Sequence, residues 1–359
     1  MLAVLPGDTG DECARHCASL FAVHVPTKAR SALPSDFVSN KQTPVAVLAG
    51  GVGAARFIRA LLSVIPGSEI TAIVNTGDDT ELHGLHISPD IDTIIYTVAG
   101  AIDPERGWGL RDESWTALSS LKRYEGVRPE GSSAAPTWFN LGDRDLATHF
   151  YRTARLREGA TLSQVTSEIA NAWGVQIRVR PMSDEPVRTF VHLKDSGAQI
   201  PFQEYFVKHR HTVPVDGITF GGIEEAKFAC DDVLAGAQTV VIAPSNPIVS
   251  IGPIRALNGV DRILAERRDS VVAISPIVAG SALKGPADRM LTELGHEASV
   301  VGVARMYAPI CGTLVIDHAD ANLADAVRAE GMRCVVGATI MGEPEVDAAL
   351  AKLVLEAGQ

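Results

Sequence analysis

The sequence predicts an α/β protein built on a doubly wound, mostly parallel sheet, with a smaller inserted α+β cap domain. Short apolar runs of strand length alternate with longer amphipathic segments from Val45 onward, which is typical of repeated β-α units. The first apolar run, 45–49, ends in a glycine turn, and the second, 70–74, ends in an acidic loop. Ligands of such sheets bind where the strands end and the strand order reverses. The pattern therefore predicts a Rossmann-like core with its ligand beside these two loops.

The individual elements follow from local signals. Ser88 as an N-cap and Pro89 at the first helical position predict a helix that runs to about residue 99. The segment 161–164 has the residues of a capping box and predicts a helix to 173. Further helices are expected after the glycine turn and within 107–123 and 146–156. Strands are expected at 45–49, 70–74, 175–179, 187–193, 213–220, 239–243, 270–274, 299–303, 313–316 and 332–336.

Three parts of the chain differ in pattern. Residues 1–44 have no clear period and mix Pro, Ser and charges, so we expect a flexible N-terminal extension. Its Cys13, His16 and Cys17 lack a fourth ligand at a spacing that suits zinc. Residues 45–159 and 236–359 are expected to form the Rossmann-like nucleotide-binding core. Residues 160–235 alternate with a period nearer two, which indicates the inserted cap.

Composition limits the classes of partner. Of the 359 residues, 46% are hydrophobic and 21% are charged, as in soluble globular proteins. The net charge of -11 disfavours non-specific contact with nucleic acid or an anionic membrane, and the aromatic content of 5% disfavours base-stacking platforms. The five cysteines are scattered, and we see neither a signal peptide nor an apolar run of membrane-spanning length. We therefore expect a cytoplasmic protein with reduced thiols.

The glycine turn suits a phosphate group. Gly50, Gly51 and Gly53 let backbone N–H groups approach an anion at the start of a helix. The turn is not a Walker A loop, because no Gly-Lys-Ser/Thr follows, and it is a poor dinucleotide fingerprint, because Arg56 stands where a last Gly or Ala is expected. Tight strand-to-helix packing alone remains an alternative for this turn.

Carboxylates crowd the end of the second strand and the helix after it. They are Asp78, Asp79, Asp90 and Asp92. Oxygen ligands in this number suit Mg²⁺, which bridges carboxylates to substrate phosphates, and we expect Asp79, Asp90 and Asp92 as its ligands. The helix dipole alone would also account for Asp90, so Asp92 is the stronger candidate. For His86 a hydrogen-bonding role is favoured over zinc.

Three further loops follow predicted strands or precede predicted helices. Asn140, with Asp143 and Arg144, indicates a second wall of the cleft, although Asp143 could only cap and Arg144 could pair with Asp145 or Asp78. The loop after the strand expected at 239–243 has Ser245 and Asn246, whose donors suit a nucleotide or phosphate, although this loop could also be only a rigid turn. The loop after the strand expected at 270–274 has Lys284, a candidate cation for phosphate.

Six strings resemble a known family. In chain order they are GGVGAARF, NTGDDTELHGLHISPDIDTIIYTVAG, NLGDRDLATHF, RPMSDEPVRTF, APSNPIVSIGPI and SPIVAGSALKGPA. They are similar to the 2-phospho-L-lactate transferase family of coenzyme F420 biosynthesis, and the first loop most resembles its actinobacterial branch, the phosphoenolpyruvate transferases. The resemblance covers the chain from about Val45 to its end. It implies a Mg²⁺-dependent, homodimeric transferase that acts on small molecules.

The resemblance implies a specific reaction. The ribityl hydroxyl of the deazaflavin Fo would attack the phosphate that carries a C3 acid in a guanosine diphosphate-activated donor, and GMP would leave. Enolpyruvyl-diphospho-5'-guanosine, the expected donor, would give dehydro coenzyme F420-0. Lactyl-diphospho-5'-guanosine, the alternative donor, would give coenzyme F420-0.

Site residues carry over by position. Asp92 and Asn140 match positions expected to contact Fo, although archaeal members are expected to have a basic residue in place of Asn140. Asp92 or Asp79 would hold Mg²⁺ near the transferred phosphate, and one of them would accept the hydroxyl proton. The glycine turn matches as well, and Ser245 and Asn246 match a loop that we assign to the guanosine nucleotide.

Two other functions fit the same fold. A nicotinamide-dependent dehydrogenase is disfavoured by the broken dinucleotide fingerprint. A nucleotide-binding sensor without catalysis is disfavoured by the crowded carboxylates between Asp78 and Asp92.

Overall fold

The computed structural model describes residues 45–132 and 134–359. The predicted N-terminal extension and its Cys13, His16 and Cys17 lie outside the described residues.

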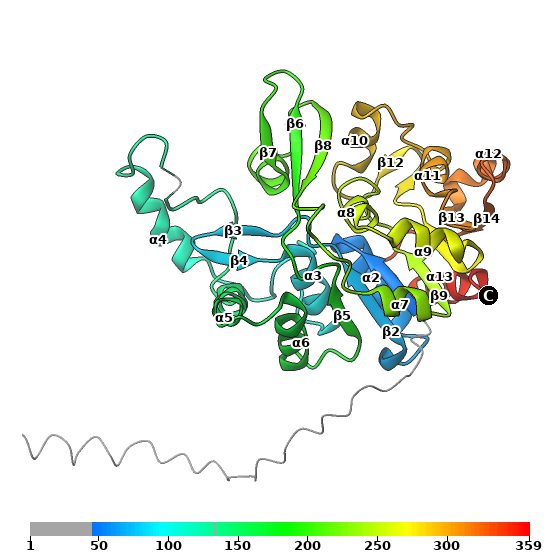
Figure 1. The fold of residues 1–359 in the computed structure, drawn as a ribbon, viewed down its shortest axis with the longest axis horizontal. Coiled ribbons are helices and arrows are strands. Elements are labelled where there is room, and N and C mark those ends of the chain that lie inside the picture. The colour runs from blue at the N-terminus through cyan, green and yellow to red at the C-terminus, as the bar shows by residue number, and fades with distance from the viewer. Residues whose placement is uncertain (1–44, 133) are drawn as a thin grey trace, which may run out of the picture. The chain divides into compact units, whose positions relative to one another are not determined.

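A parallel sheet of seven strands forms the centre of the described fold (Figure 1). Its strands are β1 (Val45–Ala49), β2 (Ile70–Val74), β5 (Arg178–Pro181), β9 (Thr239–Ile242), β10 (Val271–Ile274), β13 (Thr313–Asp317) and β14 (Arg333–Gly337). They lie in the order β14-β13-β10-β9-β1-β2-β5, and every neighbouring pair is parallel. After β1, the strands β2 and β5 add on one side of it, and the later strands β9, β10, β13 and β14 add on the other. The strand order therefore reverses between β1 and β9, and the predicted doubly wound sheet is confirmed.

Apolar side chains cover both faces of this sheet. In β1, Ala46 and Leu48 belong to one buried cluster, whereas Val45 and Val47 belong to another. Successive residues of a strand point to opposite faces, so the two clusters lie on opposite sides of the sheet. One face is covered by α2 (Gly51–Leu62), α3 (Pro89–Val98), α6 (Leu162–Ala172) and α13 (Pro344–Ala357). The other is covered by α7 (Asp231–Gly236), α8 (Gly252–Ala256), α9 (Val260–Glu266), α10 (Ala287–Glu293), α11 (Val300–Tyr307) and α12 (Ala324–Ala329).

Smaller antiparallel pieces flank the central sheet. The strands β6 (Arg188–Leu193), β7 (Gln199–Pro201) and β8 (Val215–Gly221) form a separate sheet in the order β7-β6-β8, with a π-helical turn at Glu204–Lys208. Two hairpins pair β3 (Thr80–Leu82) with β4 (Leu85–Ile87) and β11 (Ile277–Val278) with β12 (Ser281–Ala282). The helices α4 (Thr116–Glu125) and α5 (Asp145–Arg157) come after α3 in the chain, and α5 packs on β4 and α6.

Local signals predict the starts of α3 and α6 correctly. Ser88 is the N-cap of α3 and Pro89 begins it. At the start of α6, Thr161 Oγ1 accepts from the backbone N–H of Gln164 at 3.2 Å, and the Gln164 side chain accepts from the N–H of Thr161 at 2.9 Å, as the capping box predicts.

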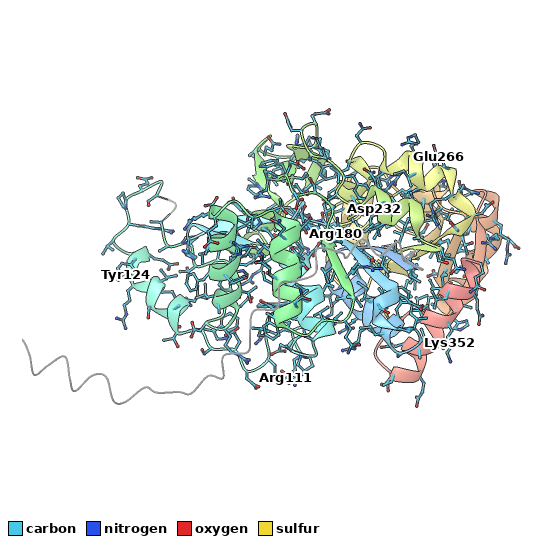
Figure 2. The ribbon with its side chains drawn as sticks, turned by 60° about the horizontal axis from the view of Figure 1, so that its bottom comes forward. Arg111, Tyr124, Arg180, Asp232, Glu266 and Lys352 are labelled. Carbon is cyan, nitrogen blue, oxygen red and sulfur yellow. The ribbon has the colours of Figure 1, made fainter. Side chains whose placement is uncertain are left out.

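Two expectations about strands are wrong. The segment 299–303 begins the helix α11, because Ser299 Oγ accepts from the N–H groups of Val301 and Gly302 at 3.1 Å and so caps a helix. The strand expected at 175–179 within the inserted cap is β5, at the edge of the main sheet. Its Arg180, labelled in Figure 2, donates to the carbonyl of Ala229 at 2.8 Å and ties this edge to the chain that returns from the small sheet. The antiparallel part is therefore confined to β6, β7 and β8.

The described helices were also compared with the thickness of a bilayer. Within residues 45–132 and 134–359, none combines the length and the apolarity that a membrane crossing requires.

We predict that Gly53→Ala lowers the free energy of unfolding by about 1–2 kcal/mol, although alanine is the better helix former. A Cβ at this position would lie 2.3 Å from the carbonyl oxygen of Pro244 and push apart the loops after β1 and β9. Gly126→Ala is the control, because nothing lies within 4 Å of its Cβ position. Urea unfolding measures both variants, and equal midpoints for Gly53→Ala and the wild type would contradict the prediction.

Candidate functional site

A cavity of about 660 Å³ borders the loops that follow β1 and β9, at the reversal of strand order. This is where the sequence predicts the ligand. Of the predicted site residues, the cavity is lined by Gly50, Gly51, Gly53, Asp78, Asp90, Asp92, Asn140, Ser245, Asn246 and Lys284. Asp79, Asp143 and Arg144 do not line it. The fold thus brings together side chains from six separate segments of the predicted site.

The glycine turn gives the cavity its amide-lined edge. Gly51 has a φ of +71° at the first position of α2, in the region that favours glycine. A Cβ at Gly50 would lie 2.7 Å from Ser250 Cβ and 2.9 Å from Asp90 Oδ2. Across the sheet reversal, Ser245 Oγ donates to the carbonyl of Gly50 at 2.7 Å. The turn is therefore held in place from both sides while the first N–H groups of α2 face the cavity edge.

Three buried carboxylates lie together beside this turn. Burial, followed by the charge of Asp90, raises the pKa of Asp78 well above its usual value. Burial also raises the pKa of Asp90 to about 7, although Asn75 donates to Asp90 Oδ2 at 2.9 Å and lowers it in part. Among the described residues, Asp78 Oδ1 and Asp79 Oδ1 are buried and have no hydrogen-bond partner. Buried carboxylates that lack a positive partner, such as Asp78 and Asp90 at the cavity, fit a hard divalent cation such as Mg²⁺.

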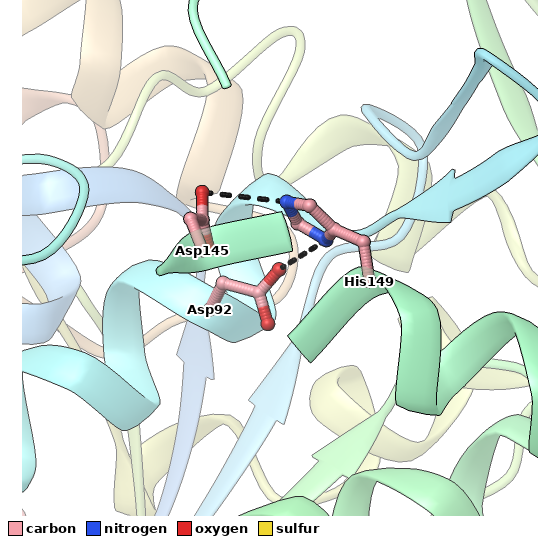
Figure 3. A group of neighbouring side chains, drawn as sticks. All are labelled: Asp92, Asp145 and His149. Atoms are coloured by element: carbon pink, nitrogen blue, oxygen red, sulfur yellow. Dashed lines mark ion pairs between the residues drawn. The ribbon is translucent and has the colours of Figure 1, made fainter. Parts of the chain in front are cut away.

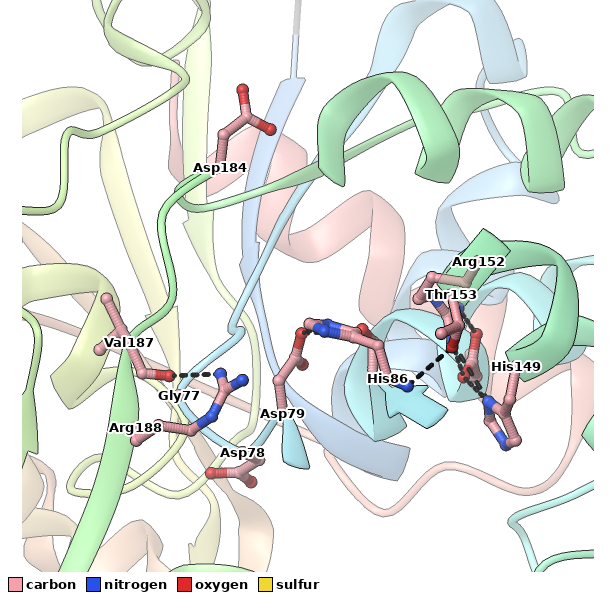
Figure 4. Close-up of polar contacts among 12 residues, drawn as sticks. Gly77, Asp78, Asp79, His86, His149, Arg152, Thr153, Asp184, Val187 and Arg188 are labelled. Atoms are coloured by element: carbon pink, nitrogen blue, oxygen red, sulfur yellow. Dashed lines mark hydrogen bonds and ion pairs between the residues drawn. The ribbon is translucent and has the colours of Figure 1, made fainter. Parts of the chain in front are cut away.

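Asp79 is held from behind the cavity (Figure 4). Its Oδ2 accepts from Ser88 Oγ at 2.8 Å and lies 2.9 Å from His86 Nε2. The backbone N–H of His86 in turn donates to Thr153 Oγ1 on α5 at 2.8 Å. The hydrogen-bonding role predicted for His86 is confirmed, and the Ser88 side chain serves Asp79 rather than the backbone of α3.

Asp92 has a structural partner that the sequence does not reveal. Arg152 on α5 is fully buried and donates to both carboxylate oxygens of Asp92, with 3.0 Å between Nη1 and Oδ2. Burial raises the pKa of Asp92, and the charge of Arg152 opposes that rise. Asp92 therefore also has a structural role, since removing its carboxylate would strand a buried guanidinium.

His149 extends this cluster toward a second carboxylate (Figure 3). Its Nδ1 lies 3.8 Å from Asp92 Oδ2, and its Nε2 lies 3.3 Å from Asp145 Oδ2 without the alignment of a hydrogen bond. Tyr96 donates to Asp145 at 2.6 Å. Ligand atoms of Asp92, Asp145 and His149 lie within 4.8 Å of one another, as in a metal centre. Arg152 already supplies a positive charge there, so a metal fits Asp78 and Asp90 better than Asp92.

The second wall differs from its prediction in two residues. Asp143 accepts from the N–H groups of Thr116 and Ala117 at 2.9 Å and so caps α4. Hydrogen bonds, first from Ser114, lower its pKa to about 2. Arg144 pairs with neither Asp145 nor Asp78: its guanidinium donates to the carbonyl of Arg111 at 2.6 Å. Both residues build the wall from outside the cavity.

The loop after β9 also has a structural role. Asn246 Oδ1 accepts from the N–H groups of Ile248 and Val249, at 2.9 and 3.4 Å, and fixes the turn before α8. Its neighbour Ser245 is 4% exposed and joins this loop to the glycine turn. The rigid-turn alternative is thus correct for the backbone, while both side chains still border the cavity.

Sequence reasoning missed an aromatic wall and the cluster on α5. The cavity is also lined by Trp108, Phe139, Phe202 and Phe206, which have no common spacing in the sequence. The α5 cluster had a signal, because Asp145, His149 and Arg152 are four and three residues apart and share one face of a predicted helix.

Comparisons with known proteins agree on one family. The model of a family described as 2-phospho-L-lactate transferase CofD matches residues 45–346. A Kitasatospora aureofaciens protein named phosphoenolpyruvate transferase is 42% identical over 318 residues, which cover 87% of this chain and 96% of that protein. A Mycobacterium tuberculosis protein of the same name is 37% identical over 327 residues, which cover 86% of this chain and 96% of that protein. A crystal structure of a Bacillus halodurans protein has a TM-score of 0.56 at 14% identity, covers 88% of this chain and 100% of its own, and shows the shared fold alone.

We predict that Arg152→Met lowers the free energy of unfolding by about 3–5 kcal/mol, because it leaves Asp92 buried without its partner. Arg262→Met is the matched control. Its guanidinium pairs with Glu266 at 3.0 Å with both side chains more than 60% exposed, so we expect a loss below about 1 kcal/mol. Chemical denaturation measures both, and similar losses in the two variants would contradict the prediction.

We predict a pH-dependent contribution of Asp90 to stability in the absence of divalent cations. Its pKa rises from 3.8 to about 7 on folding, so the folded state binds the extra proton and stability falls as pH rises from about 4 to about 7. Unfolding free energies of the wild type and Asp90→Asn across this range give the measurement. The wild type should lose more stability than the variant, and parallel curves would refute the assignment.

Proposed function

The chain belongs to the 2-phospho-L-lactate transferase CofD family, and from that premise we propose that it transfers a phosphoenolpyruvyl group in coenzyme F420 biosynthesis. The donor would be enolpyruvyl-diphospho-5'-guanosine, and the acceptor would be the ribityl hydroxyl of the deazaflavin Fo. Relatives named phosphoenolpyruvate transferase, at 37–42% identity over most of the chain, support this choice of donor. The observation that carries the proposal is the cavity that joins an amide-lined turn to buried carboxylates at the sheet reversal.

The proposed reaction exchanges the phosphoanhydride bond of the donor for a new phosphate ester bond to Fo. The Fo hydroxyl oxygen forms a bond to the phosphorus that carries the enolpyruvyl group, and the bond from that phosphorus to the GMP oxygen breaks. The hydroxyl proton leaves to a base, and GMP leaves with the bonding electron pair. Dehydro coenzyme F420-0 is the other product. Such a step depends mainly on positioning and on neutralising charge around the phosphate.

The chain supplies the positioning groups. The glycine turn at the start of α2 lines the cavity and has no side-chain cap, so the first N–H groups of this helix suit the diphosphate. Ser245 and Asn246, across the reversal, suit the nucleotide end of the donor. The apolar rings of Trp108, Phe139 and Phe206 offer surfaces on which the flat deazaflavin could stack.

Asp78 and Asp90 are the residues that would hold Mg²⁺. Both line the cavity and both are buried. Burial raises both pKa values, with a further rise from the charge of Asp90 on Asp78 and from the charge of Asp79 on each of them. A bound Mg²⁺ would neutralise phosphate charge as it develops. Asp79 does not line the cavity, and Ser88 and His86 hold its carboxylate in place next to Asp78 in the chain.

Asp92 is the proposed acceptor of the hydroxyl proton. It lines the cavity and is 5% exposed. Arg152 fixes the orientation of its carboxylate through two hydrogen bonds. A proton taken up there would be shared with the neighbouring His149, which also lines the cavity.

The product tests the proposal directly. The purified chain is incubated with Fo, Mg²⁺ and either the enolpyruvyl or the lactyl guanosine donor, and mass spectrometry determines the masses of the products. We expect GMP and dehydro coenzyme F420-0, which is lighter by two hydrogens than the lactyl product, and we expect EDTA to abolish turnover. Faster turnover of the lactyl donor would favour the alternative, and no product with either donor would refute the transferase.

Asp92→Asn tests the proposed base at nearly constant side-chain size, and its urea midpoint is measured alongside because the change also weakens the pairing with Arg152. Turnover should fall by at least about 100-fold, in the range of a lost general base, and turnover like that of the wild type would exclude Asp92 from this role.

A further inference from the structure

Lys284 brings a positive charge to the cavity, opposite in sign to the carboxylates, and Arg56 lies on the adjoining helix α2 outside the residues that line the cavity. Lys284 lies in the loop between β12 and α10 and lines the cavity. A Cβ at Gly107 would lie 2.9 Å from Lys284 Nζ and 3.5 Å from Val52 Cγ1. The ammonium group is therefore seated between the Gly107 loop and the first turn of α2.

Arg56 approaches the same place from α2 itself. It lies in the second turn of that helix, and long side chains of a helix point back toward its N-terminus. Burial lowers the pKa of Lys284, and the positive charge of Arg56 lowers it further. Arg56 therefore adds positive charge near the ammonium group of Lys284, from outside the residues that line the cavity.

Neither cation is neutralised by the protein. In the segments that the structure describes, no carboxylate lies within ion-pair distance of Lys284 or Arg56. The neighbouring Arg106 shows the contrast, since it pairs with Asp103 at 2.9 Å and stacks on Trp108 at 5.3 Å. In a chain with a net charge of -11 and 43 acidic residues, an unpaired pair of cations beside a cavity indicates an anionic ligand group.

The first turn of α2 therefore separates two regions of opposite charge. Asp90 Oδ1 lies 3.8 Å from the Cβ position of Gly51, on the acidic side. Lys284 Nζ, on the basic side, lies next to Val52. A ligand with a metal-bound phosphate and a second anionic group would match both regions at once.

We propose that Lys284 and Arg56 together bind an anionic oxygen group of the guanosine donor. This inference rests on the proposed function for the identity of the donor. The group is either the carboxylate of the C3 acid or a phosphate of the diphosphate. GDP distinguishes the two, because it has the diphosphate but lacks the acid.

Binding measurements on Lys284→Gln, Arg56→Gln and the double variant test the site. Isothermal titration with Mg²⁺ present uses GDP, the enolpyruvyl donor and Fo as probes. Each substitution should weaken donor binding by about tenfold, as expected for a lost hydrogen bond to a charged group, while Fo binding stays unchanged. Weaker binding of the donor but not of GDP identifies the carboxylate, and equal weakening of both identifies a phosphate.

Controls separate this site from folding and from general charge. Lys352→Gln, on α13 with an exposed side chain (Figure 2), removes the same charge elsewhere and should bind the donor like the wild type. Lys284→Arg keeps the charge and should retain binding. Urea midpoints near that of the wild type show that the variants fold.

Donor and GDP affinities within twofold of the wild type in the double variant would overturn the proposal, as would a loss confined to Fo. Failure of the proposed function is distinct, since the wild type would then form no product. In that case, weaker GDP binding by the double variant would still support the anion site, and unchanged GDP binding would overturn it.

Discussion

The parallel pairing of β1 with β2 on one side and with β9 on the other is the constraint on which the site depends. Because these pairings are parallel, the loops that leave β1, β2 and β9 all emerge at one edge of the sheet. Because the strand order reverses there, the helices that follow turn to opposite faces and leave room between them. The hydrogen bond from Ser245 to Gly50 closes this arrangement at its base.

Burial of charge then decides what each part of the cavity can do. The negative charge of Asp92 is neutralised within the protein, since Arg152 donates a hydrogen bond to each of its carboxylate oxygens. Asp78 and Asp90 have no such cation, and their pKa values are raised by burial. The pairing with Arg152 keeps Asp92 ionised and fixes its orientation, whereas carboxylates without such a partner are suited to a cation that arrives with the substrate.

The carboxylates and the glycine turn are also linked mechanically. Asn75 Oδ1 accepts from the N–H of Gly77 at 2.8 Å and shapes the acidic loop. The same side chain donates to Asp90, whose carboxylate lies against the Cβ position of Gly50. A shift of the loop after β2 would therefore move the amides at the start of α2. This coupling gives a physical reason for glycine at positions where any side chain would collide with the acidic residues.

The sequence by itself determined the sheet, the positions of most strands, the capping box at Thr161 and the polar loops that border the cavity, because these follow from local periodicity, helix signals and motifs near strand ends. Only the tertiary structure decided the partners. Asp143 caps a helix from another segment, Arg152 neutralises Asp92, and β5 joins the main sheet. The valine-rich run after Ser299 fits a strand or a buried helix equally well by pattern, and its cap and packing select the helix. Each of these outcomes depends on contacts between residues far apart in the chain, which an alternation of apolar and polar residues does not specify.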